Sequence, residues 1–162
     1  MVGDSGDSGI VLVTGASGYI GSHIVANLLS KGMSVRATVR DSSDPERVEH
    51  LESLSVSEGG NLEIVEMDLL ENESVHNAMS GCESVIHTAA VVVLKSKRAQ
   101  EKIVDPSVVG TRNVLDAIDS TDSVKCLVHT SSTAAIRPSS WEDGQTLTTE
   151  TWADDATIEE NP

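Results

Sequence analysis

The segment IVLVTGASGYIGSHIVANLLSKG, residues 10–32, constrains the fold more than any other part of the chain. It starts with a short apolar run, passes through glycines spaced Gly-x-x-Gly-x-x-Gly, and continues with apolar residues at helical spacing. This pattern predicts a buried strand over residues 10–14 and a helix over residues 19–31 that ends at Gly32. A strand, a glycine turn and a helix in this order are typical of a nucleotide-binding βαβ unit.

Each glycine of the turn has a physical role in that interpretation. Gly15 allows the sharp turn out of the strand, Gly18 lets the backbone approach a pyrophosphate, and Gly21 lets helix and sheet pack closely. The start of the helix adds free N–H groups and the positive end of the helix dipole. The residues predicted to bind the phosphates are Gly15, Ser17, Gly18, Tyr19, Ile20 and Gly21.

Apolar and helical segments alternate along the rest of the chain. Further strands are predicted at 34–40, 62–66, 84–87 and 125–130, and further helices at 73–79, at 103–118 and after Pro45, with Asp44 as N-cap. From residue 133 on, the pattern is that of a polar loop. The alternation predicts right-handed crossovers and a parallel sheet, which is the doubly wound α/β (Rossmann) fold. The runs IVLV, SVI and CLV are typical of strands buried on both faces.

The number of strands sets an expectation about stability. A full fold of this type usually has six or more strands, so we expect the sheet to be truncated after about five. The fifth strand is then an exposed edge, and the fold is marginal and prone to association. We divide the chain into a flexible leader at 1–9, a dinucleotide-binding core at 10–132 and an acidic loop at 133–162.

Charge and composition exclude several classes of function. The net charge is −15, which argues against binding to nucleic acid or to anionic membranes. No apolar run approaches the 18 residues that a membrane span needs. The two cysteines, Cys82 and Cys126, form neither a metal motif nor a disulfide framework, so a reduced, cytoplasmic protein is expected.

The histidines give no sign of a metal site. None stands at metal-ligand spacing from a cysteine or a carboxylate, so we predict no bound metal. His87 and His129 lie in predicted strands and are expected to be packed there. The others, on predicted helices, are expected at the surface: His23, His50 and His76.

The end of the second predicted strand bears on the choice of cofactor. An acid there accepts from the ribose 2′-OH of NAD, whereas an Arg accommodates the 2′-phosphate of NADP. Val39 occupies the position of the acid, Arg40 follows it, and Arg47 lies one short segment on. NADP is therefore predicted in preference to NAD. Asp41 places a negative charge beside the site, and the alternative is that both arginines are ordinary surface residues.

VTGASGYIGSHIV resembles the opening of the extended short-chain dehydrogenase/reductases, the NAD-dependent epimerase/dehydratase superfamily. VRATVRD at 35–41 is most similar to the branch of dihydroflavonol reductases and cinnamoyl-CoA reductases, which borders the 3β-hydroxysteroid dehydrogenases. The resemblance runs from about residue 10 to the last residue. It implies that Arg40 and Arg47 match basic positions that bind the 2′-phosphate.

Two further motifs gain a role from this resemblance. In EMDLLE, Asp68 matches a carboxylate that takes the exocyclic amine of adenine, and Leu69 matches a side chain that packs on the ring. The alternative for Asp68 is a polar residue that caps a strand end. In HTAA, small residues match a segment that lets the backbone lie along the adenosine ribose and pyrophosphate; these are Thr88, Ala89 and Ala90.

HTSSTAAI, which ends the fifth predicted strand, is the candidate active site. Ligands of open α/β sheets bind at the carboxyl ends of the strands, so Thr130, Ser131 and Ser132 are expected at the mouth of the cofactor cleft. The resemblance implies that Ser132 is a catalytic serine whose hydroxyl binds the substrate oxygen. Without the resemblance, the spacing of these residues predicts an ordinary strand end, whose Ser and Thr hydroxyls form hydrogen bonds with the backbone.

A general acid must also supply a proton to the carbonyl oxygen. In the family this acid is a Tyr four residues before a Lys, but the chain has only Tyr19 and no Tyr-x-x-x-Lys. The chain ends EENP, and Asn-Pro precedes that Tyr in many relatives, so truncation just before the Tyr is expected.

The predicted parent is an NADP-dependent oxidoreductase that reduces a ketone, aldehyde or thioester carbonyl of a small molecule, and this chain alone is expected to be inactive. Two alternatives stay open. One is a nucleotide-sugar epimerase or dehydratase with bound NAD. The other is a non-catalytic, dinucleotide-binding regulatory module.

Overall fold

The computed structural model describes residues 9–91, 97–137 and 142–153. Its sheet has the strand order β3-β2-β1-β4-β5, and all neighbours are parallel. The strands are β1 (Ile10–Thr14), β2 (Ser34–Val39), β3 (Asn61–Glu66), β4 (Cys82–His87) and β5 (Cys126–His129). The strand order reverses between β1 and β4, which is where a doubly wound sheet opens a crevice for a ligand. The predicted fold class is confirmed.

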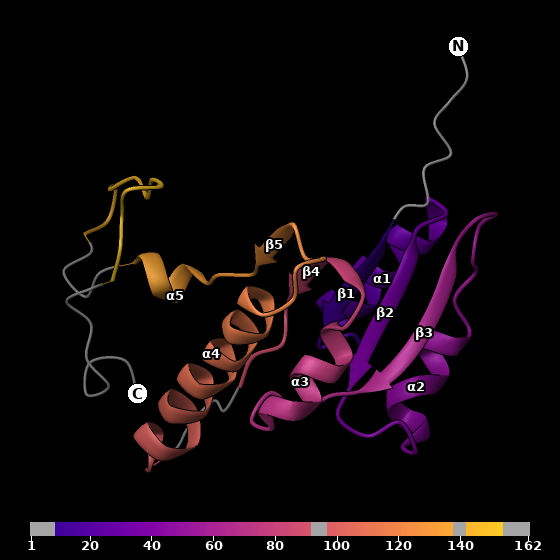
Figure 1. The fold of residues 1–162 in the computed structure, drawn as a ribbon. Coiled ribbons are helices and arrows are strands. Elements are labelled where there is room, and N and C mark those ends of the chain that lie inside the picture. Colours follow the sequence, from indigo (N-terminus) through magenta and orange to yellow (C-terminus); the bar gives the residue numbers. More distant parts are fainter. Residues whose placement is uncertain (1–8, 92–96, 138–141, 154–162) are drawn as a thin grey trace.

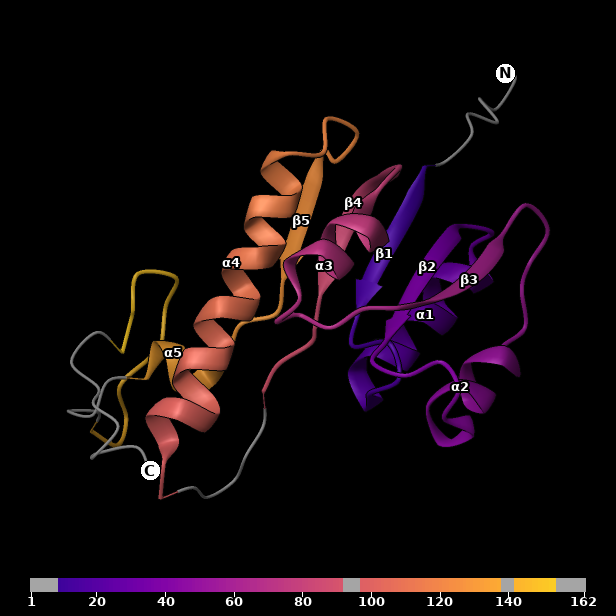
Figure 2. The same cartoon turned by 60° about the horizontal axis from the view of Figure 1, so that its bottom comes forward.

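Helices cover both faces of this sheet (Figures 1 and 2). The helices α1 (Tyr19–Ser30) and α2 (Pro45–Glu52) pack on one face, and α3 (Asn72–Met79) and α4 (Asp105–Asp119) pack on the other. A π-helical turn, η1 (Gln100–Val104), precedes α4, so the regular helix begins at Asp105 and not at the predicted residue 103. The predicted N-cap of α2 is confirmed, because the Asp44 carboxylate accepts from the Glu46 N–H at 3.1 Å.

The core consists of two apolar layers, one on each face of the sheet. Alternate residues of a strand point to opposite faces, so Val11 and Val13 of β1 join the layer under α1 and α2, whereas Leu12 joins the layer under α3 and α4. In β4 the corresponding division places Ile86 on the α1 side and Val85 on the α4 side. The run IVLV is buried on both faces as predicted, since Val11, Leu12 and Val13 are all buried.

The strand β5 is the edge of the sheet, as predicted, but the prediction that CLV is buried on both faces is wrong. Cys126 and His129 are exposed, and 53% of Val128 is accessible. Val128 pairs with Ile86 in register and so belongs to the α1 side, where no helix of the described residues covers β5. The prediction that His129 is packed is wrong for the same reason, since the residue ends an uncovered edge strand.

The segment after β5 differs from the predicted polar loop. A short helix, α5 (Thr133–Ile136), follows Ser132, and the Ala153 N–H donates to the Ala135 carbonyl at 3.0 Å. Parts of the predicted acidic loop, residues 138–141 and 154–162, lie outside the described residues. The first eight residues of the predicted leader also lie outside them. Gly9, the last leader residue, donates its N–H to the Glu83 carboxylate at 3.1 Å.

Arg36 of β2 joins three elements near the amino end of the sheet. Its Nη1 donates to the carbonyls of Ala78 at 2.9 Å and Ser80 at 2.6 Å, at the end of α3, and its Nε donates to Glu63 at 2.7 Å. The Arg36 side chain is only 14% exposed. Removing it leaves these acceptors without their charged donor.

We expect Arg36→Met to lower the free energy of unfolding by about 1.5–3 kcal/mol, the usual range for hydrogen bonds to a charged group. Urea unfolding at neutral pH measures this change. The matched control is Arg47→Met, which removes an arginine whose 2.9 Å pair with Asp44 is 40% and 34% exposed. Exposed pairs contribute about 0–1 kcal/mol, so equal effects of the two substitutions would contradict this account of Arg36.

Candidate functional site

The glycine turn between β1 and α1 lies at the reversal of strand order. Gly15 has φ +66°, and a Cβ there would come within 2.9 Å of the Ala89 Cα, just after β4. A Cβ at Gly21 would lie 2.2 Å from the Gly15 carbonyl oxygen. Gly15 therefore permits the close approach of the β4 segment, and Gly21 permits the close approach of α1 to the turn.

The start of α1 is open to an anion. Gly18 is its N-cap, so no side chain caps the helix, and no acidic residue occupies the first turn. The first N–H groups of a helix have no partner within it, and here the side chains around them are exposed, 83% for Tyr19 and 55% for Ile20. A Cβ at Gly18 would have only the Gly15 oxygen, at 3.2 Å, within 4 Å. These residues fit a phosphate-bearing cofactor, because they offer donors without a competing side chain.

Thr14 joins the carboxyl ends of β1 and β4, and the sequence analysis did not identify it. The N–H groups of Thr88 and Ala89 each donate to its Oγ1 at 3.1 Å, and the Thr88 hydroxyl donates to its carbonyl at 2.6 Å. Its Oγ1 also lies 2.7 Å from Nδ1 of His87. The available signal was a hydroxyl residue that ends an otherwise apolar buried strand, directly before the first glycine.

His87 is buried, as predicted, with 2% of its surface accessible. Burial, and to a smaller extent the neighbouring His129 ring, 5.1 Å away between centroids, lower its pKa to about 4. His87 is therefore a neutral imidazole at physiological pH. The three remaining histidines lie on helix surfaces as predicted, with His23 exposed and the other two half-buried: His50 and His76.

The carboxyl end of β2 presents a positive side chain beside the turn. Arg40 is exposed and has no ion pair among the described residues, whereas Val39 before it is buried. The Asp41 carboxylate accepts from both the N–H and the hydroxyl of Ser43, at 2.9 and 2.7 Å, and these bonds lower its pKa. Asp41 is thus held within its own loop, and Arg47 is paired with Asp44.

Asp68 and Leu69 follow β3 at the same edge of the sheet. The Asp68 carboxylate accepts from the Leu70 N–H at 2.9 Å, so one of its oxygens already forms a hydrogen bond within the loop. Leu69 is half-buried against α4, where a Cβ on Gly110 would lie 3.1 Å from the Leu69 Cβ. The Leu69 carbonyl also accepts from Asn113 at 2.7 Å. Each of the two residues therefore has a structural partner.

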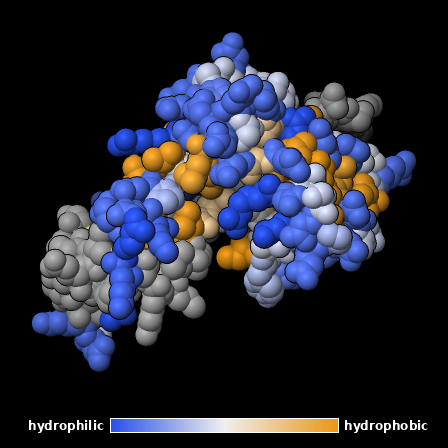
Figure 3. Space-filling view, turned by 90° about the horizontal axis from the view of Figure 1, so that it is seen from below, coloured by the Kyte–Doolittle hydropathy of each residue, from blue (hydrophilic) through white to orange (hydrophobic). Residues whose placement is uncertain are grey.

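The candidate catalytic segment lies beyond β5 and is exposed. The Thr130 N–H donates to the His87 carbonyl at 2.9 Å, which continues the pairing of β4 and β5 by one residue. Ser132 caps α5, because its Oγ accepts from the Ala134 N–H at 3.1 Å. The Ser132 hydroxyl proton is not used in that bond. Figure 3 looks onto this carboxyl edge and shows apolar surface on both sides of a hollow.

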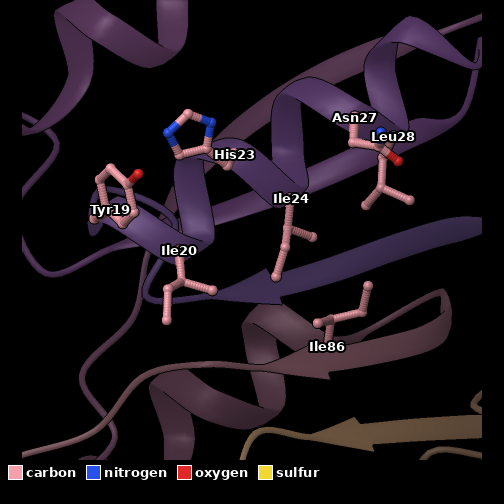
Figure 4. Close-up of a pocket in the computed structure, with 7 residues that line it drawn as sticks. All are labelled: Tyr19, Ile20, His23, Ile24, Asn27, Leu28 and Ile86. Atoms are coloured by element: carbon pink, nitrogen blue, oxygen red, sulfur yellow. The ribbon is translucent and has the colours of Figure 1, made fainter.

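A groove runs along α1 next to the glycine turn. Ile20 and Ile24 extend from the helix toward the sheet, where Ile86 of β4 lies opposite, and Tyr19 and His23 point away from it (Figure 4). The rings of Tyr19 and His23 meet edge to face at 4.8 Å. The groove exists because no helix of the described residues covers β4 and β5 on this side, and Tyr19 and Ile20 at the start of α1 line the part of it nearest the glycine turn.

The fold and the glycine turn define a dinucleotide-binding α/β protein of the Rossmann type. The chain belongs to the 3-beta hydroxysteroid dehydrogenase/isomerase family, whose model matches residues 12–160. This confirms the extended short-chain dehydrogenase/reductase resemblance. No helix among the described residues is long and apolar enough to cross a membrane.

Individual relatives agree with the predicted branch. The chain is 42% identical over 127 residues to a cinnamoyl-CoA reductase of Medicago truncatula, covering 78% of this chain and 39% of that protein. It is 38% identical over 130 residues to a bifunctional dihydroflavonol 4-reductase/flavanone 4-reductase of Malus domestica, covering 80% and 37%. Yeast methylglyoxal/isovaleraldehyde reductase complexed with NADPH superimposes with a TM-score of 0.75 at 28% identity, covering 93% and 45%. The chain thus spans about two fifths of the length of these proteins.

Proposed function

We propose that the chain forms the NADP-binding part, residues 10–132, of a reductase that acts on a carbonyl group of a small molecule. The observation that carries the proposal is the uncapped start of α1 at the strand-order reversal, with the exposed Arg40 at the end of the neighbouring β2. NADPH, when bound, supplies the hydride for such a reaction. The related reductases named above support this proposal, and so does the yeast enzyme's complex with NADPH.

The residues of the chain would act mainly by binding and orientation. The first-turn N–H groups of α1 would hold the pyrophosphate, and Arg40 would bind the 2′-phosphate, since Asp41 is engaged with Ser43. The free hydroxyl proton of Ser132 would hydrogen-bond the substrate oxygen. We propose a cytoplasmic location from the two free thiols, Cys82 and Cys126.

We expect the chain to bind NADPH more tightly than NADH, and Arg40→Ser to weaken NADPH binding about 10- to 100-fold while leaving NADH binding unchanged. The reason is the loss of a charge-assisted contact to the 2′-phosphate, worth about 1.5–3 kcal/mol. Titration calorimetry with each cofactor measures this. Lys31→Ser, which removes the same charge from the exposed end of α1 at the opposite edge of the sheet, is the matched control.

An equal loss for NADPH and NADH in Arg40→Ser would contradict the assigned role of Arg40. Absence of NADPH binding by the wild-type chain would contradict the proposed function itself. We also expect no carbonyl reduction by this chain, because it contains no Tyr-x-x-x-Lys to supply the proton.

A further inference from the structure

We propose that His87 is a positioning residue for the dinucleotide site, acting through the hydroxyl of Thr14 as a neutral imidazole protonated only on Nε2. This inference rests on the proposed function, since the site that it positions is the NADPH crevice. His87 itself does not touch the start of α1. Its effect passes through the hydrogen bonds that join β1 to β4.

The valences of the Thr14 hydroxyl fix the proton position on His87. A hydroxyl oxygen accepts two hydrogen bonds and donates one. The Thr88 and Ala89 N–H groups, each at 3.1 Å, use both acceptor sites. The single proton of Thr14 must therefore go to Nδ1 of His87 at 2.7 Å, which makes Nδ1 an acceptor and leaves the ring proton on Nε2.

Burial makes this arrangement costly to disturb. Thr14 has 0% and His87 2% of its surface accessible, so water cannot replace a lost partner. A buried hydroxyl without its acceptor is unfavourable, because its lost hydrogen bond is not replaced by one to water. The hydroxyl would have to turn, and its oxygen would then lose one of the two hydrogen bonds that it now accepts from the Thr88 and Ala89 N–H groups.

The Ala89 N–H bond holds the segment after β4 close to the glycine turn. The Ala89 N and Cα would lie 3.0 and 2.9 Å from a Cβ on Gly15, so Ala89 is already at the closest approach that the glycine turn allows. The Thr88 hydroxyl closes the ring of bonds by donating to the Thr14 carbonyl at 2.6 Å. Through this ring, the acceptor at position 87 holds the β4 segment against the turn that carries the phosphate donors.

The test compares substitutions that keep or remove the acceptor. His87→Asn retains a side-chain oxygen that can accept from Thr14, whereas His87→Leu fills the space without an acceptor. We expect His87→Leu and Thr14→Val each to weaken NADPH binding at least about tenfold. Their double variant should lose no more than either one alone, and His87→Asn and Thr14→Ser should stay near wild type.

Three measurements separate positioning from general destabilisation. Arg36→Met, which lowers stability away from the crevice, should keep wild-type NADPH affinity. Two-bond ¹H–¹⁵N correlation spectra should show His87 as the Nε2–H tautomer, and amide exchange of Thr88 and Ala89 should be faster in His87→Leu than in His87→Asn. Neither measurement requires cofactor, and the tautomer is read in the wild-type chain, so it remains informative if His87→Leu folds poorly.

An Nδ1–H tautomer, or wild-type NADPH affinity in folded His87→Leu, would overturn the proposal. So would an equal loss of affinity in His87→Asn and His87→Leu. If the wild-type chain binds no NADPH, the proposed function fails and the cofactor part of this inference fails with it. The two failures can be told apart, because the wild-type chain still binds NADPH if only the role of His87 is wrong.

Discussion

Gly21→Ala is expected to be the most destabilising single-methyl change in the glycine turn. A Cβ at this position would lie 2.2 Å from the Gly15 carbonyl oxygen and 2.9 Å from the Ala16 Cα. Both are backbone atoms, so neither can move aside as a flexible side chain could. We expect the free energy of unfolding to fall by about 3 kcal/mol or more, the upper range for overpacking of a tight contact. Urea unfolding monitored by circular dichroism measures the loss.

Two other glycines serve as controls for this prediction. Gly81→Ala adds a methyl group where nothing lies within 4 Å, so only its φ of +74° opposes the change, at about 1–2 kcal/mol. Gly18→Ala meets one atom at 3.2 Å and should fold nearly as well as wild type. Because Gly18 faces the proposed phosphate site, its variant should lose NADPH affinity with little loss of stability. A Gly21→Ala protein as stable as the Gly81→Ala protein would refute the packing argument.

The second large effect is a loss of stability in acid that depends on His87. Its pKa is about 4 in the folded chain, against 6.5 for an unperturbed histidine. Above pH 6.5 the ring is neutral in both states. Between pH 6.5 and 4 the unfolded chain binds the proton first, so stability falls as the pH falls, and the loss is complete below about pH 4. The shift corresponds to about 3 kcal/mol.

Denaturant unfolding between pH 7.5 and 4 measures this dependence in the wild type and in His87→Asn, which cannot titrate. The asparagine variant should lose less stability over that interval by about 3 kcal/mol. Parallel curves for wild type and His87→Asn would show that His87 contributes nothing to the acid sensitivity.

The sequence predicted most of the fold because its signals are local. Strands and helices follow from apolar spacing, and the parallel sheet follows from their alternation. The glycine turn was recognisable because a positive φ at Gly15 and a close contact at Gly21 admit no side chain. The N-cap at Asp44 was equally local. The wrong predictions concern the burial of β5 and the loop where α5 forms. Burial of an edge strand depends on which other elements cover it, and the local sequence does not determine that.

The sequence by itself determined the class of the chain and the place of its glycine turn, and it predicted the basic residues proposed to favour NADP. These depend on the residue types required at fixed spacings. The structure showed the local bonds by which Ser43 holds Asp41 and Ser132 caps α5, and only the tertiary structure decided that Thr14 meets His87. Thr14 and His87 lie 73 residues apart in sequence. The pairing of β1 with β4 brings them together, since hydrogen bonds between distant segments exist only once the sheet has set its register.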